Sequence, residues 1–145
     1  MDVGETLVDE TRLWEGWAAY LGVSTNEFIS VLHETIARGD EHRRALEHFK
    51  PGLDVAAARQ ERESLGDPDV FDERDLYPDA QRSILSLRSA GYRVGIAGNQ
   101  PMQAEAVFAR IGLQVDLVAS SARWGWPAIF ASHGPKVWPA SISRV

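Results

Sequence analysis

The chain has 145 residues and no cysteine, and its 21 acidic and 15 basic side chains give a formal charge of −6. This length favours one domain, or a domain with a small insertion, and an apolar fraction of 44% is enough for a hydrophobic core. The absence of cysteine excludes a disulfide framework, and the acidic net charge argues against nucleic-acid binding. The sequence contains no apolar run of the roughly 20 residues that span a bilayer, so we expect a cytoplasmic protein without a membrane partner.

Charge is distributed unevenly along the chain. Residues 1–116 carry all 21 acidic side chains and 12 of the basic ones. Residues 117–145 carry three basic side chains, no acidic one, and three of the five tryptophans. We expect this break in composition to separate a folded part from a divergent tail at residues 125–145.

Residues 12–65 show the periodicity of amphipathic helices joined by short connections. Ser24 with Glu27 three residues later is a capping-box pattern, and Asp40 and Asp54 are placed to cap two further helices. On the helix that Ser24 opens, one side is expected to face inward: Phe28, Val31, Leu32, Thr35 and Ile36. The pattern predicts a bundle of four short helices.

The next stretch, which we name the acidic segment, comprises residues 67–78. Five acids and two prolines predict a loop. Its acids lack the spacing of a calcium-binding loop, which favours a solvated loop. Asp79 is then placed to cap a helix that turns Ile84, Leu85 and Leu87 inward.

Helices and strands alternate in the part that follows. We expect a strand at residues 92–97, a helix at residues 103–111 and a strand at residues 115–119. This order is typical of a βαβ crossover. It predicts parallel strands with helices on their faces.

The run Asp2-Val3-Gly4-Glu5-Thr6-Leu7 is a compact loop pattern that can direct one carboxylate outward. A carboxylate so placed can attack phosphorus or bind Mg²⁺ through hard oxygen ligands. Thr6 can hydrogen-bond the turn. The alternative is that Asp2 is a solvated acid at a frayed terminus.

Residues 2–12 resemble the first motif of the haloacid dehalogenase (HAD) superfamily of hydrolases, and residues 76–78 and 91–99 resemble the approach to its second motif. The helical stretch between them lies where many members insert a helical cap. The resemblance covers residues 2–124 and implies an α/β fold. A partial Rossmann-like HAD core would comprise residues 1–9 and 76–124, with an inserted helical cap at residues 10–75.

The same resemblance implies Mg²⁺-dependent hydrolysis of a small phosphorylated metabolite. Asp2 would be the nucleophile that forms an aspartyl-phosphate, and Asp2 and the Gly4 carbonyl would be Mg²⁺ ligands. Thr6, Gly98 and Asn99 would bind the phosphate group.

The sequence departs from the family's phosphatases at both motifs. The second aspartate of the first motif, which protonates the leaving group, is replaced by Gly4, and the adjacent Glu5 should point in a different direction. The Ser or Thr that ends the family's second-motif strand is replaced by Gly98.

The ends of the chain also depart from the family, and we expect it to be truncated. Only Met1 precedes Asp2, where members have a buried strand. No acid follows Asp116 to serve as a fourth-motif metal ligand, and Lys136 is more simply a tail charge than a catalytic lysine. Two alternatives therefore stay open: a dehalogenase-type or other non-phosphatase hydrolase that uses Asp2, and a non-catalytic HAD-fold binding module or gene remnant.

Overall fold

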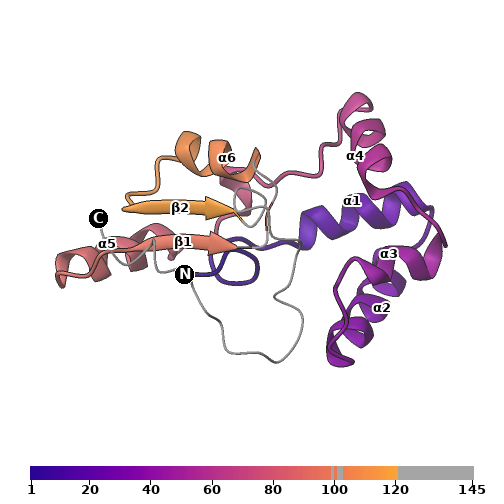
Figure 1. The fold of residues 1–145 in the computed structure, drawn as a ribbon, viewed down its shortest axis with the longest axis horizontal. Coiled ribbons are helices and arrows are strands. Elements are labelled where there is room, and N and C mark those ends of the chain that lie inside the picture. Colours follow the sequence, from indigo (N-terminus) through magenta and orange to yellow (C-terminus); the bar gives the residue numbers. More distant parts are fainter. Residues whose placement is uncertain (99, 101–102, 121–145) are drawn as a thin grey trace.

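The computed structural model describes residues 1–98, 100 and 103–120, so the expectations for Asn99 and for residues 121–145 lie outside it. Within the described residues, four helices gather on one side of a pair of strands, and two further helices flank the strands (Figure 1). The elements are α1 (Thr11–Leu21), α2 (Thr25–Ala37), α3 (Arg44–Phe49), α4 (Val55–Ser64), η1 (Glu73–Asp75), α5 (Ala80–Ser89), β1 (Gly95–Gly98), α6 (Gln103–Ile111) and β2 (Leu117–Ser120). None of the described helices is long and apolar enough to cross a membrane.

The predicted caps of the first four helices are confirmed at two positions and wrong at one. Ser24 Oγ accepts a hydrogen bond from the Glu27 N–H, and the Asp54 carboxylate accepts from two N–H groups of the first turn of α4. Asp40 does not cap α3, which begins at Arg44. Instead, the Asp40 N–H donates to Thr35 O and helps to end α2, beyond Gly39 at a φ of 77°.

The four helices enclose a hydrophobic cluster of their own. Trp17, Phe28 and Leu46 are at its centre, and Trp14 stacks on Phe28 with the ring centroids 6.0 Å apart. The expectation that Ile36 faces inward is wrong, because this side chain is 54% exposed. Thr35, also expected to face inward, is buried, and its hydroxyl donates to Val31 O at 2.7 Å.

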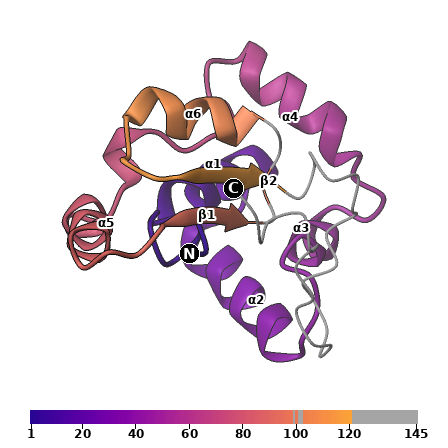
Figure 2. The same ribbon diagram turned by 60° about the vertical axis from the view of Figure 1, so that its left-hand side comes forward.

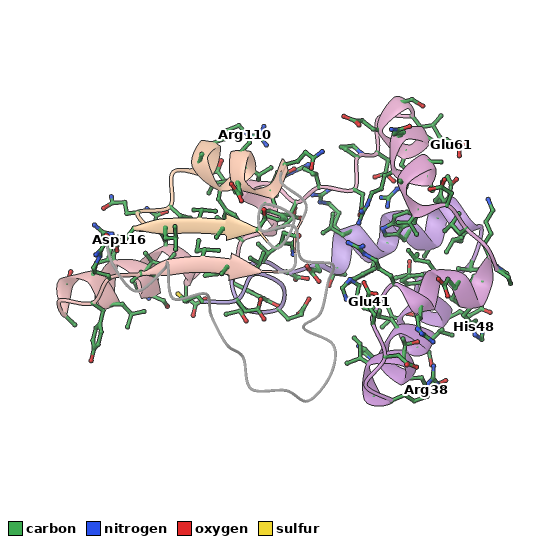
Figure 3. The ribbon with its side chains drawn as sticks, viewed as in Figure 1. Arg38, Glu41, His48, Glu61, Arg110 and Asp116 are labelled. Carbon is green, nitrogen blue, oxygen red and sulfur yellow. The ribbon has the colours of Figure 1, made fainter. Side chains whose placement is uncertain are left out.

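The two strands run parallel, as predicted. Gly95 pairs with Leu117 and Gly98 with Ser120, and α6 packs against β2 in both views (Figure 2). Both strands begin later than expected because Asp116 takes over the pairing before them. Its N–H donates to Val94 O and its carboxylate accepts from the Val94 N–H, both at 2.7 Å. Asp116 lies at the end of the strands that is far from α1–α4 (Figure 3).

The first residues of the chain lie along the other side of β1. The Met1 nitrogen donates to Gly95 O at 2.6 Å, and the Ala97 N–H donates to Met1 O at 3.0 Å. This is the hydrogen-bond pattern of a parallel pair. Asp2 therefore follows at the carboxyl edge of the strands, the edge toward which the arrowheads in Figure 1 point and which faces α1.

A second hydrophobic cluster joins the strands to their helices. Ile84 of α5, Ile96 of β1 and Phe108 of α6 are buried in it, together with Val3 and Leu7 of the opening loop. Asp79 occupies the N-cap position of α5, but its carboxylate makes no capping hydrogen bond. The expectation that Leu85 and Leu87 face inward is also wrong, since they are 37% and 38% exposed.

The acidic segment is not the solvated loop that its composition suggests. Asp69 and Asp75 are among its least exposed side chains and form ion pairs with arginines. Asp75 accepts hydrogen bonds from the Arg12 guanidinium, and the second arginine partner, Arg59, donates to Asp69 at 2.6 Å. Arg12, which is more than 50 residues away in sequence, and Arg59, on the preceding helix, thus fix the path of this segment.

The acidic segment in turn holds the opening loop. The Asp9 N–H donates to Asp75 O at 2.8 Å, and the Tyr77 N–H donates to Leu7 O at 3.0 Å. These two bonds flank an antiparallel bridge between Val8 and Leu76. We call this arrangement, formed by residues 7–9 and 75–77, the loop contact.

We expect Arg12→Ala to destabilise the fold by about 1 to 3 kcal/mol, because it leaves the buried Asp75 carboxylate without its cation. Arg12 itself is 35% exposed at its side chain, which keeps the loss below that of a fully buried pair. The measurement is urea unfolding followed by circular dichroism. Arg44→Ala, an exposed arginine, is the matched control. Equal midpoints for the two variants would contradict a supporting role for this ion pair.

Candidate functional site

The candidate nucleophile, Asp2, lies at the carboxyl edge of the strands and is exposed. The Val3 N–H donates to Asp2 Oδ1 at 2.8 Å, which fixes one carboxylate oxygen. Val3 itself is buried, and its carbonyl accepts hydrogen bonds from the N–H groups of Leu7 and Val8. The loop is therefore anchored directly behind the carboxylate that it presents.

Gly98 ends β1 directly against this loop. A Cβ atom at residue 98 would come within 2.8 Å of Val3 Cγ2, closer than side chains approach in proteins. A serine or threonine could not stand here without moving Val3. The close approach of Val3 therefore favours glycine at the end of β1.

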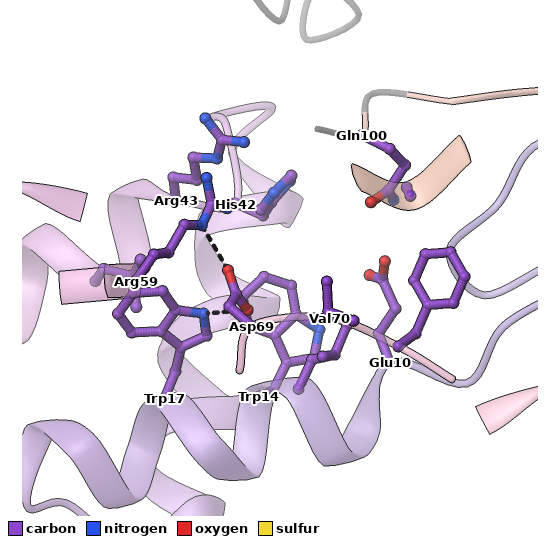
Figure 4. Close-up of a pocket in the computed structure, with 13 residues that line it drawn as sticks. Glu10, Trp14, Trp17, His42, Arg43, Arg59, Asp69, Val70 and Gln100 are labelled. Carbon is purple, nitrogen blue, oxygen red and sulfur yellow. Dashed lines mark hydrogen bonds and ion pairs between the residues drawn. The ribbon is translucent and has the colours of Figure 1, made fainter. Parts of the chain in front are cut away.

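Gly4 is also a position of close approach. A Cβ atom at residue 4 would lie 2.6 Å from a carboxylate oxygen of Glu10, so the space beside the Gly4 backbone is filled by the Glu10 side chain. Glu10 is the residue before α1, and its side chain points into the space between the helices and the strands (Figure 4). The site therefore has a second carboxyl group next to residue 4, that of Glu10.

Glu5 has a structural role. Its backbone is in the left-handed region at a φ of 52°, which is uncommon for a residue with a side chain. Its carboxylate accepts hydrogen bonds from the Glu10 N–H at 3.1 Å and from the Tyr77 hydroxyl at 2.8 Å. The second contact raises the pKa of Tyr77 to about 12. Both oxygens of Glu5 are thus used to hold the loop.

The pKa of Glu10 is raised to about 7. Burial is the largest cause, and the negative charges of Glu5, Asp2 and Asp69 add to it, while a hydrogen bond with Gln100 opposes it. The carboxyl group of Glu10 therefore gains or loses its proton near neutral pH.

A pocket of about 70 Å³ lies between the helices and the strands (Figure 4). Glu10 and Gln100 stand on its strand side, and His42, Arg43 and Arg59 stand on its helix side. The rest of the lining is mostly apolar: Leu13, Trp14, Trp17, Leu46, Val70, Phe71 and Ala104, with Asp69. Burial lowers the pKa of His42, and the neighbouring positive charge of Arg43 lowers it further.

The other predicted site residues are placed as follows. Thr6 is exposed in the opening loop, and its N–H rather than its hydroxyl bonds the turn, at 3.4 Å to Val3 O. Gly4 O accepts no hydrogen bond from the described residues. Asn99 lies outside the described residues. Among residues 1–98, 100 and 103–120, no group of three or more His, Cys, Asp or Glu side chains is placed to hold a metal ion.

Sequence reasoning did not identify Glu10, Gln100 or Arg43. Of these three residues, only Glu10 had a signal in the sequence, because it lies between the run that begins at Asp2 and the first helix. Arg43 lies among other charged residues of a short helical stretch, where nothing in the spacing separates it from Arg44.

Comparison with known proteins adds no assignment. The sequence matches no model of a known protein family, and no curated protein matches it.

We expect Glu10→Gln to raise stability at pH 8 relative to wild type by up to about 3 kcal/mol, with little gain at pH 5. A carboxyl whose pKa is about 7 in the folded state and 4.5 otherwise binds its proton more tightly when folded. The folded state therefore loses stability as the pH rises between these values, and the amide removes that loss.

The measurement is urea unfolding at both pH values in metal-free buffer. Glu15→Gln, an exposed acid on α1, is the control and should show no such difference between the two pH values. The account of Glu10 fails if its variant gains nothing at pH 8.

Proposed function

We propose that the protein is a Mg²⁺-dependent phosphatase of small phosphorylated metabolites that uses Asp2 as its nucleophile. The observation that supports this most is the position of Asp2. Hydrogen bonds from Met1 to β1 carry it to the carboxyl edge of parallel strands, where open α/β sheets bind their ligands. The pocket between helices and strands opens beside the same edge.

In this reaction, a carboxylate oxygen of Asp2 attacks phosphorus in line with the ester oxygen. The bond between phosphorus and the ester oxygen breaks, and the departing oxygen takes up a proton to leave as the alcohol. Water then hydrolyses the aspartyl-phosphate, which releases inorganic phosphate and restores the carboxylate. The two steps leave the enzyme unchanged and consume one water molecule.

The donor set fits Mg²⁺ in type. Mg²⁺ prefers oxygen ligands and is commonly held by one or two carboxylates, with water and substrate phosphate completing the shell. The exposed carboxylate of Asp2 would supply one such ligand, and the carbonyl oxygen of Gly4, which accepts no hydrogen bond within the described part of the chain, would supply a second. When bound, the ion would neutralise charge on the phosphoryl oxygens.

Negative charge at this edge also supports a cation. Asp2, Glu5 and Glu10 lie close enough together that their charges raise the pKa of Glu10. The positively charged side chains that line the pocket stand on its helix side, and one of them, Arg59, is already paired with Asp69. A divalent ion would offset the repulsion among the three carboxylates.

We expect Asp2→Asn to abolish Mg²⁺-dependent hydrolysis of an aryl phosphate, with a loss of at least about a thousandfold, because an amide cannot form the aspartyl-phosphate. Release of the phenol is measured with Mg²⁺ and with a chelator. Asp79→Asn is the matched control, since Asp79 is exposed and its carboxylate makes no capping hydrogen bond.

Three outcomes would contradict the proposal in different ways. Hydrolysis that survives Asp2→Asn would exclude Asp2 as the nucleophile. Activity on a haloacid but not on a phosphate ester would favour the dehalogenase-type alternative. No turnover by a folded wild-type chain on either substrate would favour a non-catalytic binding module.

A further inference from the structure

The two strands carry different side chains on their two faces. Because successive residues of a strand point to opposite faces, Ile96 and Val118 share one face. Both side chains pack in the hydrophobic cluster that includes Ile84 of α5 and Phe108 of α6, so both helices cover this face. The opposite face, which we call the open face, carries four residues: Gly95 and Ala97 of β1, and Leu117 and Ala119 of β2.

The open face is apolar and is covered less well. Neither hydrophobic cluster of the described residues includes a residue of this face. Leu117 is 41% exposed, Gly95 and Ala97 are half-buried, and Ala119 is buried. Sheets of parallel strands are almost always covered by other elements on both faces. The open face is therefore expected to receive a further segment or a partner.

The open face is too small to bind a separate protein stably. Two strands of four residues form a surface about 13 Å long and about 10 Å wide, or roughly 130 Å², at the usual spacings of a β-sheet. A stable interface between two proteins covers about 800 Å² on each partner. A segment of the same chain needs less area, because its attachment keeps it at an effective concentration on the order of millimolar. The size of the face thus favours a tethered segment.

Residues 121–145, which we call the C-terminal segment, are attached at the right place. They follow Ser120, the last residue of β2, and they lie outside the described residues. Their length is sufficient, since ten residues in a helix span about 15 Å, more than the length of the open face. Their composition suits an apolar surface, because they include three of the five tryptophans of the chain.

Charge distinguishes the C-terminal segment from a second copy of the chain. The segment carries three basic side chains and no acidic one, whereas residues 1–120 carry 21 acidic and 12 basic side chains. These two parts of the chain attract one another. Two copies of the chain, each with a formal charge of −6, repel one another.

We propose that the C-terminal segment packs through its tryptophans on the open face and completes the hydrophobic core around the strands. The segment covers Leu117, and its basic side chains offset part of the acidic excess of residues 1–120. The segment with the divergent composition is then an integral part of the fold. This inference does not depend on the proposed phosphatase activity.

The absence of cysteine allows a single thiol to be placed on the open face. The first test measures how fast the thiol of Leu117→Cys reacts with a small aromatic disulfide. Replacing Trp124, Trp126 and Trp138 by serine should speed this reaction about tenfold, as for a site that is covered in roughly nine molecules of ten. Leu87→Cys on α5 is the matched control, because Leu87 is 38% exposed and α5 lies on the other side of the strands. Its thiol should react at the same rate with and without the tryptophans.

The second test reports contact and does not depend on the serine variants. A bimane label on the thiol at residue 117 is quenched by a tryptophan only when the two groups approach closely. Substitution of the same three tryptophans by phenylalanine keeps the C-terminal segment apolar. Bimane fluorescence should then rise at residue 117 and stay constant at residue 87. Because phenylalanine is a conservative replacement, these variants decide the question if the serine variants do not fold.

Three results would overturn the inference. Bimane fluorescence at residue 117 that is unchanged by phenylalanine would show that the C-terminal segment lies elsewhere. An equal change at residues 117 and 87 would show a general effect on the fold and no specific covering of the open face. Quenching that disappears on dilution would assign the open face to a second copy of the chain.

Discussion

The position of the candidate site depends on the loop contact, in which residues 7–9 bind residues 75–77. Two backbone hydrogen bonds, from Asp9 to Asp75 and from Tyr77 to Leu7, fix the end of the opening loop, which begins beside β1 at Met1. Asp75 is itself held by the Arg12 guanidinium from the first turn of α1. Asp75 therefore connects two elements to the segment that returns the chain to the strands: its backbone carbonyl binds the loop that presents Asp2, and its buried carboxylate binds the helix that follows.

Two glycines of the candidate site are positions of close packing. Val3 occupies the space that a side chain at Gly98 would need, and Glu10 occupies the space that a side chain at Gly4 would need. The opening loop therefore packs closely against residue 98, and the carboxyl group of Glu10 lies beside residue 4. Burial of that carboxyl among other acids raises its pKa to about 7.

Local signals in the sequence predicted much of the fold. The Ser24 and Asp54 caps, the helix at residues 103–111 and the parallel strands are confirmed because each depends on neighbouring residues or on a single crossover. Features set by distant contacts were not predictable in the same way. The burial of Asp69 depends on a tryptophan of α1 and arginines of α4. The position of Glu10 beside Gly4, and that of Arg43 in the lining of the pocket, depend on how the helices meet the strands.

The central claim is that Asp2 carries a covalent phosphoryl group during turnover. The most direct measurement is mass spectrometry of the protein quenched in acid during reaction with a phosphate ester and Mg²⁺, with the modified residue mapped by fragmentation. The account predicts a phosphoryl group on Asp2 that is absent without Mg²⁺ and absent from Asp2→Asn. Turnover without a phosphorylated protein, or with the phosphoryl group on another residue, would contradict it.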